Sequence, residues 1–78
     1  MARRAPPEVG QHYDALGNHG APIGTWEVSR LFTSHVDGVA YAELTQVGDP
    51  TRRKTVAVSA LTDPRLYSPK LKRNELRG

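Results

Sequence analysis

The chain has 78 residues, no cysteine and a net charge of +3. That length allows one domain with a small core, and the lack of cysteine excludes disulfides and thiolate zinc sites as its means of stabilisation. No run approaches the roughly 20 apolar residues of a membrane-spanning helix, and no apolar stretch follows Arg3 and Arg4 as a signal peptide requires. The sequence therefore predicts a cytoplasmic protein that does not contact a membrane.

The charge is distributed unevenly along the chain. Residues 11–49 carry one basic and five acidic side chains, whereas residues 50–78 carry eight basic and two acidic ones. The middle is therefore acidic and the C-terminal third is basic. This asymmetry indicates either an anionic partner near the C-terminal end or a solvated tail that keeps a small protein soluble.

The N-terminal part of the chain predicts two extended segments and a loop. Residues 1–8 are rich in arginine, alanine and proline, which favours a flexible, extended lead-in. Residues 9–15 predict a short first strand with Tyr13 on one face. Three glycines, an asparagine and a proline follow in residues 16–24, which predicts a loop.

A longer strand is predicted over residues 25–33. Trp26 and Val28 share one face of it, but Arg30 then falls where an apolar residue is expected. Either a β-bulge near Arg30 restores the inward pattern, or the strand leaves the core at that point. The dipeptide Asp37-Gly38 is typical of a tight hairpin turn, because both central residues of such a turn need positive φ.

The next strand, residues 39–47, alternates regularly between its two faces. Ala40, Ala42 and Leu44 lie on one face, and Tyr41 lies on the other with Glu43. Gly48-Asp49-Pro50 predicts a second turn, since proline cannot donate a hydrogen bond to a central ladder.

The remaining segments are short. Residues 54–59 predict a fourth strand, and residues 60–64 a brief turn or one 3₁₀ turn with Leu61 directed to the core. Residues 65–67 predict a last strand. Residues 69–77 form either a short helix capped by Ser68 or a frayed basic tail, because so short a helix is marginal in water.

Together these segments predict a mostly β fold, a small SH3-like five-stranded barrel over residues 9–67. Residues 1–8 form its flexible lead-in, and residues 68–78 form its basic tail or short helix. A closed or nearly closed sheet suits so small a chain because it removes exposed strand edges. The rival architecture is a small open antiparallel sheet that pairs with a second copy.

Four short motifs carry a family resemblance. They are a tyrosine-bearing first strand at 10–13, a Trp-Glu-Val second strand at 24–28, the turn 37–38 with Ala-Glu-Leu at 42–44, and a final strand at 54–61 that ends in leucine. In these motifs the chain resembles small uncharacterised bacterial proteins with an SH3-like fold. The resemblance covers about residues 9–67; it implies the fold, and it implies no settled activity.

The sequence gives no pattern of catalytic or metal-binding residues. It contains no Gly-x-Ser-x-Gly elbow, no paired carboxylates and no phosphate-binding loop with its lysine. The three histidines, His12, His19 and His35, have no zinc-site spacing. We therefore expect a protein that is not an enzyme and that uses no cofactor and no metal.

The expected function is protein binding. SH3-like barrels recognise peptides through an aromatic groove, and the candidates for such a surface are Tyr13, Trp26, Tyr41 and Tyr67. Trp26 is in register with Val28, which favours a place in the core. Tyr41 faces away from the alanines of its strand and is the better surface candidate.

Nucleic-acid binding is the alternative function. Phosphates attract clusters of basic side chains, and small β-barrels often present aromatic faces beside them. The candidate contacts are Arg52, Arg53, Lys54, Lys70, Lys72 and Arg73. These residues equally suit a charged turn and a solubilising tail, so a protein partner is expected before a nucleic acid.

Overall fold

The computed structural model describes residues 6–70 of the protein, so the predictions for residues 1–5 and 71–78 lie outside the described residues. The described chain forms five strands, one short α-helix and one 3₁₀ turn. In chain order they are β1 (His12–Leu16), η1 (Asn18–Gly20), β2 (Pro22–Thr33), β3 (Ala40–Gln46), β4 (Asp49–Ala57), α1 (Val58–Leu61) and β5 (Tyr67–Lys70).

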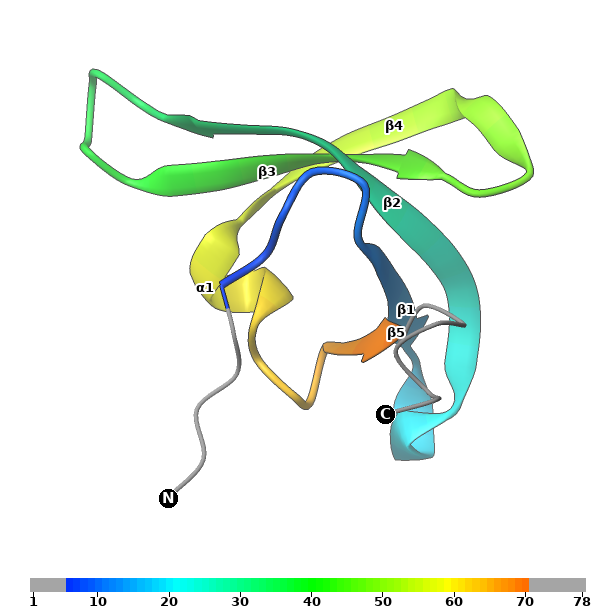
Figure 1. Ribbon diagram of the computed structural model, residues 1–78. Helices are drawn as coiled ribbons and strands as arrows, with labels where there is room; N and C mark the ends of the chain where they lie inside the picture. The colour runs from blue at the N-terminus through cyan, green and yellow to red at the C-terminus, as the bar shows by residue number, and fades with distance from the viewer. Residues whose placement is uncertain (1–5, 71–78) are drawn as a thin grey trace, which may run out of the picture.

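The five strands form one antiparallel sheet in the order β4-β3-β2-β1-β5 (Figure 1). The predicted mostly β fold with five strands is therefore confirmed. The predicted closure is not observed, because within residues 6–70 β4 and β5 lie at opposite edges and do not pair with each other. The sheet is open.

The long strand β2 contains the bulge that the sequence suggested. Val28 pairs with Leu44 and Arg30 pairs with Glu43, so Ser29 is one extra residue on the β2 side of the ladder. A bulge of this kind bends the strand and shifts the alternation of its side chains by one position. Leu31 consequently pairs with Ala42 on the inner face, while Arg30 stays outside.

The core lies between the inner face of the sheet and α1. Its buried side chains come from every strand except β4, together with α1: they are Tyr13, Ala15, Val28, Ala42, Leu44, Leu61 and Tyr67. Trp26, Val56 and Val58 pack against this cluster. Figure 1 shows α1 beneath the crossing strands β2, β3 and β4. Leu61 reaches the core from there, as the sequence predicted.

The β2–β3 connection differs from the predicted two-residue turn. Gly38 has a φ of 69°, but Asp37 does not have positive φ, and the loop is closed by a hydrogen bond from the Ser34 amide to the Val39 carbonyl oxygen, 2.9 Å. The side chain of Asp37 explains the difference. Its Oδ1 accepts a hydrogen bond from the Val39 amide, 2.9 Å, which favours a wider loop.

The β3–β4 turn is shifted by one residue from its predicted position. Gln46 pairs with Asp49, so Val47 and Gly48 form the turn, with a φ of 93° at Gly48. Asp49 and Pro50 already belong to β4. Proline is tolerated there because β4 is an edge strand and its missing N–H costs no hydrogen bond within a ladder.

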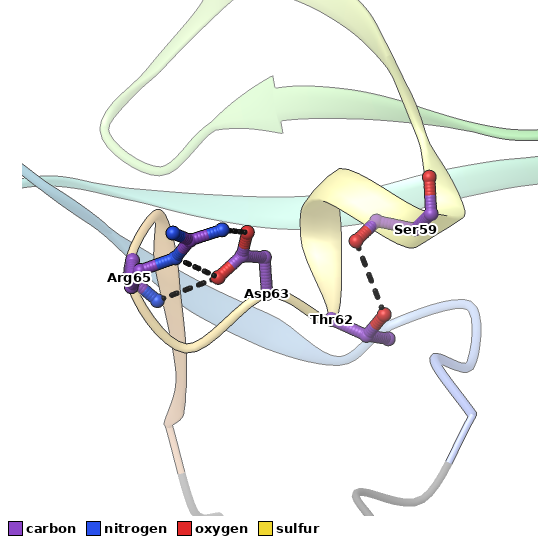
Figure 2. Close-up of polar contacts among 4 residues, drawn as sticks. All are labelled: Ser59, Thr62, Asp63 and Arg65. Atoms are coloured by element: carbon purple, nitrogen blue, oxygen red, sulfur yellow. Dashed lines mark hydrogen bonds and ion pairs between the residues drawn. The ribbon is translucent and has the colours of Figure 1, made fainter.

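The segment after β4 also differs from its prediction. The helical turn occupies Val58–Leu61 instead of residues 60–64, and a polar turn follows it, in which Asp63 accepts hydrogen bonds from the Arg65 backbone amide and guanidinium (Figure 2). The last strand is Tyr67–Lys70 rather than residues 65–67. Ser68 and Pro69 therefore extend a strand, and the predicted helix start there is wrong.

Candidate binding surface

The four predicted surface aromatics do not form one groove. Tyr13 and Tyr67 are core residues, 2% and 7% exposed, and Trp26 is half-buried against them. Tyr41 is half-buried on β3, where its neighbour Ala42 faces the core. Because successive residues of a strand point to opposite faces, Tyr41 lies on the outer face. The structure thus separates Tyr41 from the other three rings.

Lys54 covers the ring of Trp26. Its ammonium group lies 4.3 Å from the Trp26 ring centroid and 5.3 Å from that of Tyr67. A lysine over an aromatic face is attracted by the ring quadrupole, and its aliphatic stem packs on apolar surface. Lys54 was predicted to contact an anionic partner; in the structure its ammonium group lies over the rings of Trp26 and Tyr67.

An aromatic pair occupies the outer face of the β2–β3 hairpin. Phe32 and Tyr41 are directly paired in the ladder, and their rings stack with centroids 5.7 Å apart. The Arg30 guanidinium lies 4.6 Å from the Phe32 centroid. Phe32 was not among the predicted site residues. The bulge near Arg30, one of the two alternatives that the sequence indicated, would have placed Phe32 opposite Tyr41. With a bulge at Ser29, Phe32 lies on the outer face.

A hydrogen bond at the hairpin end orients the Tyr41 ring. The Tyr41 hydroxyl donates to Asp37 Oδ2 at 3.0 Å. This bond and the negative charge of Asp37 raise the pKa of Tyr41 above its usual 10.0. The hydrogen bond from the Val39 amide, followed by that from Tyr41, lowers the pKa of Asp37 below its usual 3.8. Both shifts favour the same state, in which Asp37 is ionised and Tyr41 is protonated.

We predict that Asp37→Asn returns the pKa of Tyr41 towards 10.0, because the substitution removes the charge that holds the phenol proton. The titration of Tyr41, followed by NMR of its ring carbons, checks this. Since folding lowers the pKa of Asp37, the loop contacts persist above pH 3.8 and are lost only as the pH falls below that value. An unchanged Tyr41 titration in Asp37→Asn would contradict the prediction.

A groove of about 270 Å³ lies at the same hairpin. Its walls come from β2, β3, the start of α1 and the segment before β1: they are Pro6, Pro7, Leu31, Phe32, Thr33, Ala40, Tyr41 and Val58. This wall carries hydroxyl groups only at Thr33 and Tyr41 and is otherwise apolar. Such a groove favours burial of an apolar side chain of a partner.

The hairpin end extends this apolar character beyond the groove. Val36 is 95% exposed, and Leu31 and Val39 are also exposed. Figure 1 shows the β2–β3 hairpin projecting past the body of the domain. We call Leu31, Phe32, Val36, Val39 and Tyr41 the hairpin surface.

The predicted basic contacts are dispersed. Arg52 and Arg53 are exposed on β4, whereas Lys70 lies on β5 with its ammonium group 3.8 Å from Asp14 Oδ1. Lys72 and Arg73 lie outside the described residues. Residues 6–70 contain six basic and seven acidic side chains, a net charge of −1. The positive charge of the protein therefore resides in the two terminal segments.

No three histidine, aspartate or glutamate side chains of residues 6–70 are grouped so that they could hold a metal ion. None of the helices described there has the length and apolar character required to cross a membrane.

Comparison with known protein families, curated proteins and solved structures finds no match for this chain. The geometry of the hairpin surface is therefore the basis for a functional assignment.

Proposed function

We propose that this protein is a non-catalytic binding module whose partner is another protein and whose contact site is the hairpin surface. The observation that carries the proposal is the stacked pair Phe32 and Tyr41, held on the projecting hairpin beside an apolar groove. Aromatic side chains that are fixed in place lose little conformational entropy on binding and dominate the energy of protein interfaces. The contacts from Arg30 and Asp37 restrict both rings before a partner arrives.

The burial pattern supports the hairpin as a contact surface. An apolar side chain exposed alone needs no explanation, but several on one projecting element often mark an interaction site. Leu31, Val36 and Val39 form such a group, and Phe32 and Tyr41 adjoin it. A partner that covers this group would remove apolar surface from water on both sides of the hairpin.

The charge distribution favours a protein partner over a nucleic acid. A nucleic-acid-binding domain needs a basic surface to neutralise phosphates. The described domain has a net charge of −1, and four of its six basic side chains contact an aromatic ring or a carboxylate of the same domain. Nucleic-acid binding by residues 52–54 and the C-terminal basic segment is the alternative that the experiment below tests.

We further propose that the open sheet is an SH3-like arrangement. The order β4-β3-β2-β1-β5, with β1 paired to both β2 and β5, and the helical turn between β4 and β5 support it. The bulge at Ser29 supports it as well, because it curls the sheet around its inner face.

The test is capture of protein partners from native lysate by the immobilised full chain. We expect Phe32→Ala and Tyr41→Ala to weaken capture of any specific partner by about tenfold or more, as truncation of an aromatic hot spot does. Val47→Ala is the matched control, because Val47 is an exposed apolar residue of the opposite hairpin. Thermal melts must show all three variants folded.

Two outcomes would contradict the proposal. Equal capture by the wild type and both aromatic variants would exclude the hairpin surface as the site. Binding of oligonucleotides at about 50 mM salt that falls steeply as salt rises would support the nucleic-acid alternative instead.

A further inference from the structure

The outer edge of β4 is the longer of the two sheet edges in the described chain. β4 pairs with β3 on one side, and no backbone hydrogen bond joins its other side to a described residue. In an antiparallel edge strand, alternate residues direct their N–H and C=O groups away from the sheet. Residues 53–57 are in regular register with residues 41–45 and offer a continuous edge for one more strand.

The opposite edge is a poorer template. β5 has only four residues, and one of them is Pro69, which has no N–H to donate. Its Lys70 side chain already contacts Asp14. Short length and proline are two of the devices by which proteins protect a sheet edge from further pairing. Of the two edge strands within residues 6–70, β4 is therefore the one suited to strand addition.

The charges on β4 indicate which charge would suit a strand that pairs with this edge. Of the six basic side chains in the described domain, four contact an aromatic ring or a carboxylate: Arg30 and Lys54 lie over aromatic rings, and Arg65 and Lys70 contact carboxylates. Arg52 and Arg53 are exposed and form no ion pair with a described residue. Both lie on β4, so the two basic side chains of the described domain that make no such contact are neighbours on this strand.

We propose that an extended acidic segment of a partner protein adds to the sheet as a sixth strand along β4. Backbone hydrogen bonds to residues 53–57 would hold the segment in register with β4, and its carboxylates would form ion pairs with Arg52 and Arg53. A second copy of this chain fits the edge less well, because β4 carries three basic side chains and one acidic one, so pairing β4 with β4 joins two strands of net positive charge. This edge shares no residue with the hairpin surface, which it adjoins where Ala57 pairs with Tyr41, so the proposal goes beyond the function proposed above.

The test is an NMR titration of the ¹⁵N-labelled full chain with an eight-residue peptide of alternating glutamate and threonine. We expect amide shifts concentrated in residues 53–57. We expect Arg53→Glu to weaken binding by about threefold to fivefold, because one exposed ion pair is replaced by a repulsion. Arg65→Glu is the control with the same change of charge, and it should leave the affinity unchanged because Arg65 lies outside β4, in the turn that precedes the opposite edge strand β5.

A second peptide separates strand addition from simple charge attraction. It has the same sequence with an N-methyl group on every backbone amide, which keeps the charge and removes the donors from both edges of the peptide strand. Loss of binding supports the proposal, and equal binding overturns it. Equal weakening by Arg65→Glu and Arg53→Glu overturns it too, as does tighter binding of an oligothymidylate than of the acidic peptide. Dimerisation of the chain through β4 in sedimentation experiments would assign the edge to a second copy instead.

Discussion

Replacing Leu61 with alanine is expected to lower the free energy of unfolding by about 2–5 kcal/mol, the range for deletion of a buried leucine side chain. Leu61 is fully buried, and it is the buried residue that α1 contributes to the core. The Leu61 side chain packs against the inner face of the sheet, and its backbone is held in α1. The neighbouring residues therefore cannot move easily to fill the cavity that alanine leaves. Domains of this size are stable by only about 4–12 kcal/mol, so the loss is a large fraction of the total.

Urea denaturation of the wild type and of two variants measures this effect. Leu66→Ala is the matched control, because Leu66 belongs to the same connection between β4 and β5 and is 45% exposed. We expect Leu66→Ala to change the unfolding free energy by about 0.5 kcal/mol or less, as surface substitutions usually do. Equal losses in the two variants would contradict the placement of α1 against the core.

The parts of the fold that were predicted correctly depend on local patterns. Strict alternation in β3 placed Ala42 and Leu44 inside, and Leu61 was identified as a core residue because it is the one leucine of residues 60–64. Arg30 stands where the alternation of its strand predicts an apolar residue, which indicated either a bulge or a strand that leaves the core. The pairing of β2 with β3 shows a bulge. The alternation of apolar and polar residues along a strand, and any break in it, can be seen in a sequence because it involves only residues that are close together in the chain.

The incorrect details depend on contacts that no local pattern records. The β2–β3 loop is wider than predicted because the Asp37 side chain binds the Val39 amide. Ser68 and Pro69 extend β5 because β1 offers them a pairing partner far away in the sequence. A strand formed by pairing with a distant segment has little signal in its own residues, so the sequence offered a helix capped by Ser68 or a frayed tail, and neither alternative was the strand.

Only part of the candidate site could be predicted from the sequence, for the same reason. Tyr41 was placed on the outer face by the alternation of its own strand. Phe32 joins it only through the register of two strands, and that register depends on the bulge at Ser29. The roles of Tyr13 and Tyr67 could not be separated from that of Tyr41 by residue type, because burial is decided by the packing of β1 and β5 against each other.

The bulge also predicts that two single-residue deletions, made at opposed positions of one ladder, have very different consequences. Deleting Glu43 from β3 makes Ala42 and Leu44 adjacent, so these two core residues can no longer share the inner face. We expect this variant to be unfolded, because exposing one buried leucine alone costs about 2–5 kcal/mol. Deleting Ser29 removes only the extra residue of β2 and leaves Val28 and Leu31 on their present face.

The Ser29 deletion should therefore fold, with a free energy of unfolding lower by about 1–3 kcal/mol. The variant loses the bend of β2 and the two exposed hydrogen bonds of the Ser29 hydroxyl, each of which contributes about 0.5–1.5 kcal/mol. The Ser29 hydroxyl donates to the Glu43 carbonyl oxygen at 3.0 Å and accepts from Thr45 Oγ1 at 3.2 Å. Circular dichroism and amide dispersion in ¹⁵N NMR spectra distinguish the two variants. If both deletions unfold the chain, the bulge is needed for the shape of the whole sheet and not only for the register of the β2 side chains.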